Sequence, residues 1–133
     1  LCRSARDVPL WIIAAEDASI AAERTLRATG AQVMRVGRGG DGALDLREAL
    51  ELLATRGITR VFSEGGPIVG EQLMLHDLVD VMIVSTAKRR LDQPGVIAIR
   101  DGLAGRLSDR VRFARVAIET FGDDVFETFE RPI

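Results

Sequence analysis

The chain of 133 residues contains no tyrosine and only one cysteine, one histidine and one tryptophan. Cys2 therefore has no partner for a disulfide within the chain, and no second Cys or His lies near it at a spacing that binds metal. The sequence predicts no metal site. Lysine and arginine number 18 against 20 aspartates and glutamates, so the net charge of −2 excludes the basic surface typical of a nucleic-acid-binding domain.

Long apolar runs are also missing. No stretch approaches the roughly 20 residues of a membrane span, and the first residues, L-C-R-S-A-R-D, lack the apolar segment of a signal peptide. We therefore expect no membrane partner and a cytoplasmic location. The composition, 47% hydrophobic and 29% charged, is typical of a globular chain of single-domain size. We therefore expect one domain over residues 1–133. Because the chain begins with Leu1 rather than Met, we expect it to be a processed product or an N-terminally truncated fragment.

Apolar runs and helix-compatible segments alternate along the first third of the chain. The continuous run Leu10–Ala15 is typical of a strand covered on both faces, and it contains Trp11, which we expect in the core. A helix is predicted over Ala18–Thr29, with Asp17 as its N-cap and a glycine after its last residue. The strand Ala31–Val36 follows. These elements predict an α/β fold.

The glycine-rich segment 37–42 lacks the Lys-Ser/Thr of a phosphate loop and the spacing of a dinucleotide fingerprint, which favours a flexible connection. Asp45 and Glu48 then resemble a capping box, with Asp45 at the cap. Leucines follow at helical spacing until Gly57 and predict a helix that faces the core. They are Leu46, Leu50 and Leu53.

The most informative stretch begins with a β-branched run, Ile58–Ser63, that stops at Glu64-Gly65-Gly66-Pro67. About ten helix-compatible residues follow, and an apolar run resumes over Leu78–Val84. This order predicts a strand, a crossover helix and a parallel strand. With the two earlier strands it predicts a mainly parallel sheet flanked by helices.

The Gly65-Gly66 pair falls where this strand becomes a helix, and Pro67 suits the first helical position. Free N–H groups and the positive end of the helix dipole favour an anion there, and glycines let it approach the backbone. Such a pair also marks an ordinary turn. The carboxyl end of a parallel strand favours the binding site, where Glu64 would accept hydrogen bonds from a substrate.

The last third of the chain contains fewer signals. Lys88, Arg89 and Arg90 belong to a polar loop that is either a solvated turn or a phosphate contact, and Val96–Ile99 is a possible short strand. We expect His76 to be structural, at a helix end. Apolar residues then predict a terminal antiparallel strand pair, whose edge makes a homodimer plausible. They are Val111, Phe113, Val116, Ile118, Val125, Phe126 and Phe129, the last two near the edge.

The run G-I-T-R-V-F-S-E-G-G-P-I-V-G-E-Q-L, followed by L-V-D-V-M-I-V, resembles the C-terminal reductase domain of the bifunctional riboflavin-biosynthesis deaminase/reductase. That family has a dihydrofolate-reductase-like fold, in which a strand ends in Glu-Gly-Gly-Pro before a helix. D-V-P-L-W-I-I-A-A-E-D, D-L-R-E-A-L and G-D-D-V-F-E also fall where the family has counterparts. The Glu-Gly-Gly-Pro block is the specific part of the resemblance.

The resemblance implies NADPH-dependent reduction of 5-amino-6-(5-phosphoribosylamino)uracil to its ribitylamino form. Glu64 matches the glutamate that contacts the substrate, and hydride transfer requires no nucleophile of the protein. The Gly65–Gly66 bond is expected to be cis, as it often is in relatives. The segment expected to bind NADPH, through its backbone N–H groups, comprises Gly65, Gly66, Pro67, Ile68, Val69, Gly70, Glu71 and Gln72.

The family places an earlier segment, with substrate and cofactor contacts, ahead of D-V-P-L-W, and this chain has almost none of it. The fold is therefore expected to lack its first strands, and a fused deaminase domain upstream is a further expectation. Two alternatives stay open. In the first, the chain is another NADPH-dependent pterin or pyrimidine reductase of the same fold. In the second, it is a non-catalytic remnant that binds nucleotides or dimerises.

Overall fold

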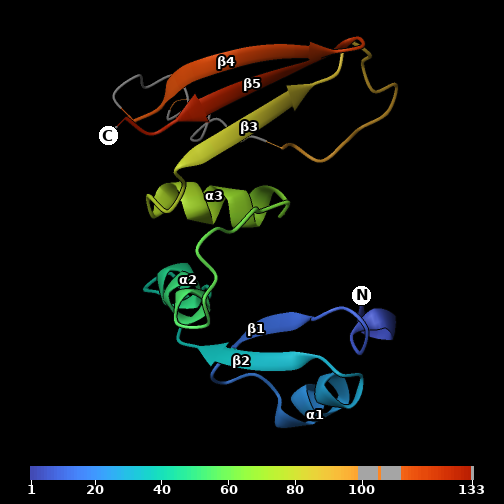
Figure 1. The fold of residues 1–133 in the computed structure, drawn as a ribbon, viewed down its shortest axis with the longest axis vertical. Helices are drawn as coiled ribbons and strands as arrows, with labels where there is room; N and C mark the ends of the chain where they lie inside the picture. The colour runs from blue at the N-terminus through green and yellow to red at the C-terminus, as the bar shows by residue number, and fades with distance from the viewer. Residues whose placement is uncertain (99–104, 106–111, 133) are drawn as a thin grey trace. The chain divides into compact units, whose positions relative to one another are not determined.

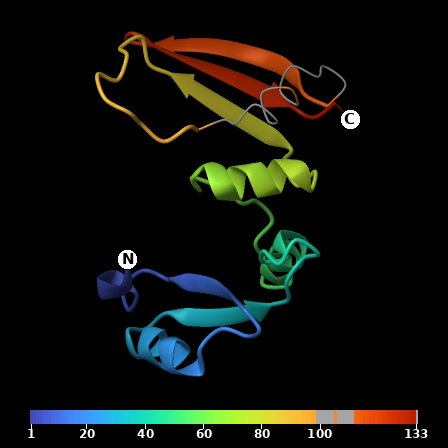
Figure 2. The ribbon, with the colours of Figure 1, turned by 180° about the vertical axis from the view of Figure 1, so that it is seen from behind.

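The computed structural model describes residues 1–98, 105 and 112–132. The chain divides into two compact units, Leu1–Val61 and Phe62–Ile133, and each is considered by itself (Figures 1 and 2). The single domain over residues 1–133 stays a prediction. The mixture of helices and strands confirms the α/β class, whereas the sheets differ from the mainly parallel sheet that the sequence predicts.

The first unit is built on a strand–helix–strand motif. After a 3₁₀ turn, β1 and β2 pair in parallel, with Trp11 opposite Gln32 and Ala15 opposite Val36, and α1 connects them (Figure 1). The predicted strands near residues 10–15 and 31–36 are confirmed. The bounds are η1 Cys2–Ser4, β1 Trp11–Ala15, α1 Ile20–Ala28, β2 Gln32–Val36 and α2 Leu46–Ala54.

The start of α1 differs from the prediction. Ser19 is the N-cap, and its Oγ accepts a hydrogen bond of 3.3 Å from the N–H of Ala22. Asp17 is wrong as the cap because its carboxylate accepts two hydrogen bonds from the guanidinium of Arg38, at 2.9 and 3.2 Å. The helix therefore begins two residues later than the sequence predicts.

The cap of α2 is half as predicted. The carboxylate of Asp45 accepts the N–H of Glu48 at 3.0 Å, so Asp45 is confirmed as the N-cap. The Glu48 carboxylate does not complete the box, because it accepts the N–H of Gly37 at 2.6 Å instead. The connection 37–44 is a turn closed by an antiparallel bridge between Arg38 and Leu44.

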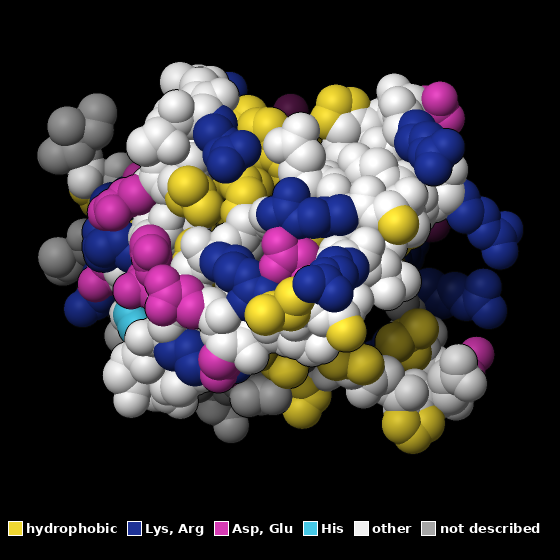
Figure 3. All heavy atoms as spheres, turned by 90° about the horizontal axis from the view of Figure 1, so that it is seen from below, with side chains coloured by type: hydrophobic (Ala, Val, Ile, Leu, Met, Phe, Trp, Pro, Cys, Tyr) yellow, Lys and Arg dark blue, Asp and Glu magenta, His cyan; other side chains and the backbone are white. Residues whose placement is uncertain are grey.

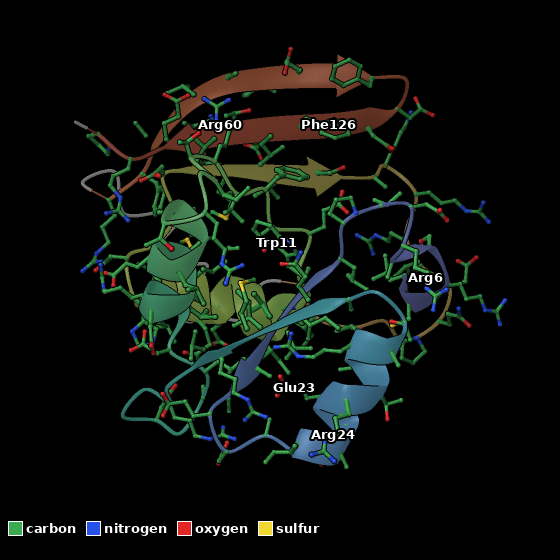
Figure 4. The ribbon with its side chains drawn as sticks, turned by 60° about the horizontal axis from the view of Figure 1, so that its bottom comes forward. Arg6, Trp11, Glu23, Arg24, Arg60 and Phe126 are labelled. Atoms are coloured by element: carbon green, nitrogen blue, oxygen red, sulfur yellow. The ribbon has the colours of Figure 1, made fainter. Side chains whose placement is uncertain are left out.

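The core of the first unit is small. Three of its seven buried residues come from β2, while β1 is half-buried over Trp11–Ala14 rather than covered on both faces. Trp11 is therefore half-buried instead of fully in the core, and the guanidinium of Arg56 lies 5.7 Å from its ring centre (Figure 4). The buried side chains of this unit are Ala5, Ala15, Ala31, Val33, Met34, Val36 and Ala49.

The second unit contains α3 and an antiparallel sheet in the order β3-β5-β4 (Figures 1 and 2). The terminal antiparallel pair is confirmed. A core cluster of Met74 and Phe113 packs against Val79, Met82 and Phe129. Val111 lies outside the described residues. The bounds are α3 Pro67–Leu75, β3 Val81–Thr86, β4 Ala114–Phe121 and β5 Asp124–Glu130.

The predicted parallel strand Leu78–Val84 is wrong in start and direction, since β3 begins at Val81 and pairs antiparallel with β5. The backbone conformation of Asp77 and the hydrogen bonds of Arg131 explain the later start of β3. Asp77 adopts a left-handed φ of 55°, and the guanidinium of Arg131 donates to the carbonyls of Asp77 and Val79 at 2.7 and 2.9 Å. The carbonyls of Asp77 and Val79 are thereby bound by Arg131 just before β3 begins.

The predicted strand Ile58–Ser63 is also wrong, because residues 58–66 have no regular secondary structure and are exposed. A strand exists only by pairing its N–H and C=O groups with a neighbour, and no described strand pairs with this run. Residues 96–98 of the possible strand Val96–Ile99 are likewise irregular, and Ile99 lies outside the described residues.

Phe126 and Phe129, near which we expected a sheet edge that could support a homodimer, do not lie on an edge strand. β5 is the middle strand, and Phe129 packs in the cluster with Met74. Phe126 makes an edge-to-face contact with Phe121 at 5.3 Å between ring centres. The homodimer itself stays a prediction without the support of Phe126 and Phe129 at an edge.

The surface carries mixed charge. Figure 3 shows basic and acidic side chains interspersed on one face, in keeping with a net charge of −2. Within the described ranges, no helix has the length and apolar character to cross a membrane. Over the same ranges, no three His, Cys, Asp or Glu side chains cluster as metal ligands would.

Candidate functional site

The sequence-predicted site is the start of α3. Gly66 is the N-cap with φ −65° and ψ −177°, and Pro67 occupies the first helical position as predicted. The first helical hydrogen bond runs from the N–H of Gly70 to the carbonyl of Gly66 at 3.1 Å. Within the described part of the chain, the N–H groups of Ile68 and Val69 make no backbone hydrogen bond. Helix starts with such open donors bind anions.

The two glycines of the junction have different roles. A Cβ on Gly65 would lie 2.9 Å from the Cβ of Val69 and 3.2 Å from the Oγ of Ser63, so this position is packed against its own chain. A Cβ on Gly66 would meet no atom within 4 Å. Gly66 therefore leaves the space through which a ligand can approach the backbone, while Gly65 lets the junction close on itself.

The expected cis bond between Gly65 and Gly66 is not found, since every peptide bond among the described residues is trans. The backbone at Gly66 is extended in ψ and ordinary in φ, so any L residue can adopt it. The described residues around Gly66 therefore do not themselves require glycine there, and they leave the outside of its backbone open.

The remaining residues of the predicted cofactor segment lie in the first turns of α3. Ile68 and Val69 are 68% and 42% exposed, which keeps the open end of the helix accessible. The N–H groups from Gly70 onward enter the hydrogen bonds of the helix. The donors available to a ligand are thus fewer than the segment Gly65 to Gln72 suggested, and they are concentrated at Gly66, Ile68 and Val69.

Glu64 directly precedes the glycine pair and is exposed. The backbone N–H of Gly65 donates to the Oγ of Ser63 at 3.3 Å, a local turn that fixes the approach of the chain to the helix. Glu64 therefore lies in irregular backbone rather than at the end of the predicted strand. An exposed carboxylate here can accept hydrogen bonds from N–H or O–H groups of a ligand.

A second polar cluster, which the sequence reasoning missed, surrounds Arg35 at the end of β2. Its guanidinium donates to the carboxylate of Glu23, with Nε at 2.9 Å, and to the carbonyls of Ala15 and Ala18 at 3.3 and 3.1 Å. It also donates to the carbonyl of Glu16. Arg35 thereby fixes the turn after β1. An arginine inside the apolar run Q-V-M-R-V was the available signal.

The acidic partners of this region are held in their charged form. Hydrogen bonds from Arg27, and then from Arg35, lower the pKa of Glu23. A hydrogen bond from Arg38 lowers the pKa of Asp17, and the same pair raises the pKa of Arg38. Residues 16–20, Glu23 and Arg35 line a shallow open hollow. The charges of Asp17, Glu23 and Arg35 are already paired within the chain, as expected for a structural cluster.

The comparison with protein families decides the assignment. Residues 3–125 match the family described as the RibD C-terminal domain. The chain belongs to the RibD C-terminal domain family. The match spans both compact units and includes the Glu64 to Gln72 segment. No curated protein sequence matches the chain significantly.

A solved structure has the same fold as this RibD C-terminal domain. It is a crystal structure of a pyrimidine reductase-like protein from Corynebacterium diphtheriae, with a TM-score of 0.65 and 18% sequence identity. The match covers 92% of this chain and 50% of that chain. The RibD domain described here thus spans about half the length of the protein it resembles.

The other candidate residues of the RibD domain lie outside the junction. His76 is the C-cap of α3, and its Nε2 lies 3.2 Å from the Oε1 of Gln72, in keeping with a structural role at the helix end. Lys88 lies 3.7 Å from the carboxylate of Asp123, with both side chains exposed. Arg89 and Arg90 line an open hollow over residues 87–93. All three side chains are exposed, and a phosphate contact at this loop stays a prediction.

Proposed function

We propose that this RibD C-terminal domain takes part in NADPH-dependent reduction of 5-amino-6-(5-phosphoribosylamino)uracil to the ribitylamino form in riboflavin biosynthesis. The observation that carries the proposal is the family match over residues 3–125, a range that includes the start of α3. The fold shared with a pyrimidine reductase-like protein supports the same chemistry.

The start of α3 fits the pyrophosphate of NADPH. The N–H groups of Ile68 and Val69 are open, the positive end of the helix dipole lies at the same place, and the space outside Gly66 is empty of protein atoms. NADPH, when bound, supplies the hydride. The protein's own contribution at this point is to bind and orient the phosphates, since hydride transfer requires no nucleophilic side chain.

Glu64 is proposed to bind the substrate rather than the cofactor. Its carboxylate is an acceptor only, so it suits the N–H and O–H groups of an aminopyrimidine or a sugar and repels phosphates. It directly precedes the glycine pair that would receive the cofactor. One carboxylate beside one group of N–H donors can therefore receive N–H or O–H groups of the substrate and phosphate oxygens of the cofactor at adjacent points.

The domain spans about half of the protein it resembles. We therefore assign turnover to a longer protein of which these residues form the cofactor-binding part. A fused upstream deaminase domain and a homodimer are compatible with that assignment. A cytoplasmic location is proposed as well, because both substrates are small charged metabolites.

The proposal is tested by NADPH titration in a calorimeter, using the longer protein. Gly66→Val should weaken binding at least about tenfold, because the branched side chain fills the approach to the helix start. Gly70→Val is the matched control, since a Cβ at Gly70 also meets no protein atom within 4 Å. Unchanged affinity in a folded Gly66→Val protein would overturn the proposal.

The likeness to a pyrimidine reductase-like protein favours a second candidate, a reductase of another pyrimidine or pterin. Oxidation of NADPH in the presence of the phosphoribosyl substrate, compared with unphosphorylated pyrimidines, separates the two. NADPH binding without turnover of any of them in the longer protein would indicate a non-catalytic nucleotide-binding remnant.

A further inference from the structure

α3 is anchored to its compact unit near its last turn. Met74, in that turn, is the buried residue of the helix, and it packs with Phe113 in the core cluster of the unit. Ile68 and Val69, in the first turn, are exposed and offer the open N–H groups of the candidate site. The anchored end of α3 is therefore opposite to the end at which a ligand would bind.

The last turn of α3 closes in a Schellman motif, a helix end in which one residue adopts the left-handed conformation. The N–H of Leu78 donates to the carbonyl of Leu73 at 2.9 Å, and the N–H of Asp77 donates to that of Met74 at 3.3 Å. Asp77 is the left-handed residue, with φ 55°, where glycine is the usual choice. A side chain at this position has a conformational cost, so the turn depends on contacts that hold Asp77 in place.

Two arginines from the last part of the chain hold this turn. The guanidinium of Arg112 donates to the carboxylate of Asp77 at 2.7 Å. The guanidinium of Arg131, the first residue after β5, donates to the carbonyls of Asp77 and Val79 at 2.7 and 2.9 Å. Its backbone N–H also donates to the carbonyl of Asp80 at 2.9 Å. Arg131 thus ties the link between α3 and β3 to the end of β5, the middle strand of the sheet (Figure 1).

The chemistry of arginine suits this position. Its planar guanidinium carries five N–H donors in a fixed arrangement, so one side chain binds two carbonyls in a defined geometry. A positive charge beside the last turn of a helix is also stabilised by the negative end of the helix dipole. Arg131 is half-buried, so solvent weakens these contacts less than it weakens those of an exposed pair. Arg131 therefore gives α3 a second fixed point in addition to Met74.

We propose that Arg131 is a positioning residue for the ligand site at the start of α3, because it fixes the direction of the helix from its opposite end. The inference rests on the proposed function, which assigns NADPH to that site. A nine-residue helix is about 13 Å long, so a small rotation about Met74 displaces the N–H groups of Ile68 and Val69 from a phosphate. Hydrogen bonds to those groups weaken steeply once their geometry departs from the optimum. Arg131 acts through α3 and is assigned no contact with the ligand.

NADPH titration in a calorimeter tests the proposal in the longer protein. Arg131→Met retains an unbranched side chain but removes the guanidinium, and it should weaken NADPH binding about 5- to 20-fold. Arg131→Lys keeps the positive charge but lacks the fork that binds two carbonyls, so it should recover only part of the affinity. Arg115→Met is the matched control, since Arg115 binds the carboxylate of Glu127 at 2.6 Å and joins β4 to β5 instead of α3 to β3. The NADPH affinity of the control should stay within about twofold of the wild type.

The melting temperature of each variant separates a positioning role from a purely structural one. Arg131→Met and Arg115→Met should both lower it by a few degrees, but only the first should also lower the NADPH affinity of the folded protein. Unchanged NADPH affinity in a folded Arg131→Met protein, or an equal loss in Arg115→Met, would overturn the proposal. Full recovery by Arg131→Lys would overturn it as well, since charge alone would then account for the effect. A wild-type protein that does not bind NADPH would contradict the proposed function and this inference with it, so the two failures are distinguishable.

Discussion

Gly65 and Val69 are in contact across the first turn of α3, at a distance that leaves no room for a side chain on Gly65. An added Cβ would approach the Cβ of Val69 to 2.9 Å and its Cγ1 to 3.1 Å. Real Cβ atoms essentially never lie so close, so either the turn or the helix would have to shift. The neighbouring Gly66 has no such constraint, and the pair thus divides into a tightly packed glycine and an open one.

The first prediction follows from this division. Gly65→Ala should lower the free energy of unfolding by about 1–3 kcal/mol, because overpacking forces the junction apart. Gly66→Ala should change it by less than about 0.5 kcal/mol, since its Cβ meets open space and its φ is ordinary. Urea denaturation of the two variants beside the wild type is the measurement. A larger loss for Gly66→Ala would show that the assignments are reversed.

The second prediction concerns Glu64. Glu64→Gln in the longer protein should lower kcat/KM for the pyrimidine substrate. The decrease should correspond to a loss of roughly 1–3 kcal/mol in transition-state stabilisation, as expected for a lost hydrogen bond to a charged group. Its affinity for NADPH should stay within about twofold of the wild type. Steady-state kinetics with calorimetry measures both quantities. A parallel loss of NADPH affinity would place Glu64 at the cofactor instead.

The third prediction is a pH dependence at Glu23, whose carboxylate accepts hydrogen bonds from Arg27 at 2.7 Å and from Arg35 at 2.9 Å. These bonds lower the pKa of Glu23 in the folded state. The stabilisation they give is therefore complete above the unfolded pKa of about 4.3 and is lost as the pH falls through the lower folded value. The stability difference between wild type and Glu23→Gln should shrink over this acid window. Urea denaturation of both proteins across this pH range is the measurement, and a difference that stays constant with pH would contradict the prediction.

Short-range sequence signals were enough to predict features whose stabilising contacts lie within one turn of the chain. Asp45 caps α2, Pro67 begins α3, and Gly122, with φ 63°, forms the turn between β4 and β5. Distant partners defeated the same reasoning elsewhere. Arg38 draws Asp17 away from the helix cap from 21 residues along the chain.

The sequence did not predict correctly which strands pair with one another. The residues Ile58–Ser63 have a genuine β propensity. A strand forms only when a neighbouring strand pairs with its backbone N–H and C=O groups. The candidate site was found from the Glu64 to Pro67 motif and from a family resemblance that the match over residues 3–125 supports. The difference between Gly65 and Gly66 was not predictable, because it depends on where the side chain of Val69 lies.

The last prediction is that the 133-residue chain alone does not turn over substrate. The open N–H groups of Ile68 and Val69 lie wholly within it, so its affinity for NADPH should fall less steeply than its activity. Turnover also requires an enclosed site that excludes water around the reacting carbon, and the hollows among the described residues are shallow and open. The longer protein, read from its natural start, should oxidise NADPH with the phosphoribosylaminopyrimidine at least about 100-fold faster than this chain. Comparable rates would mean that residues 1–133 already contain a complete active site. The half of the structural neighbour that this chain does not match would then serve another purpose.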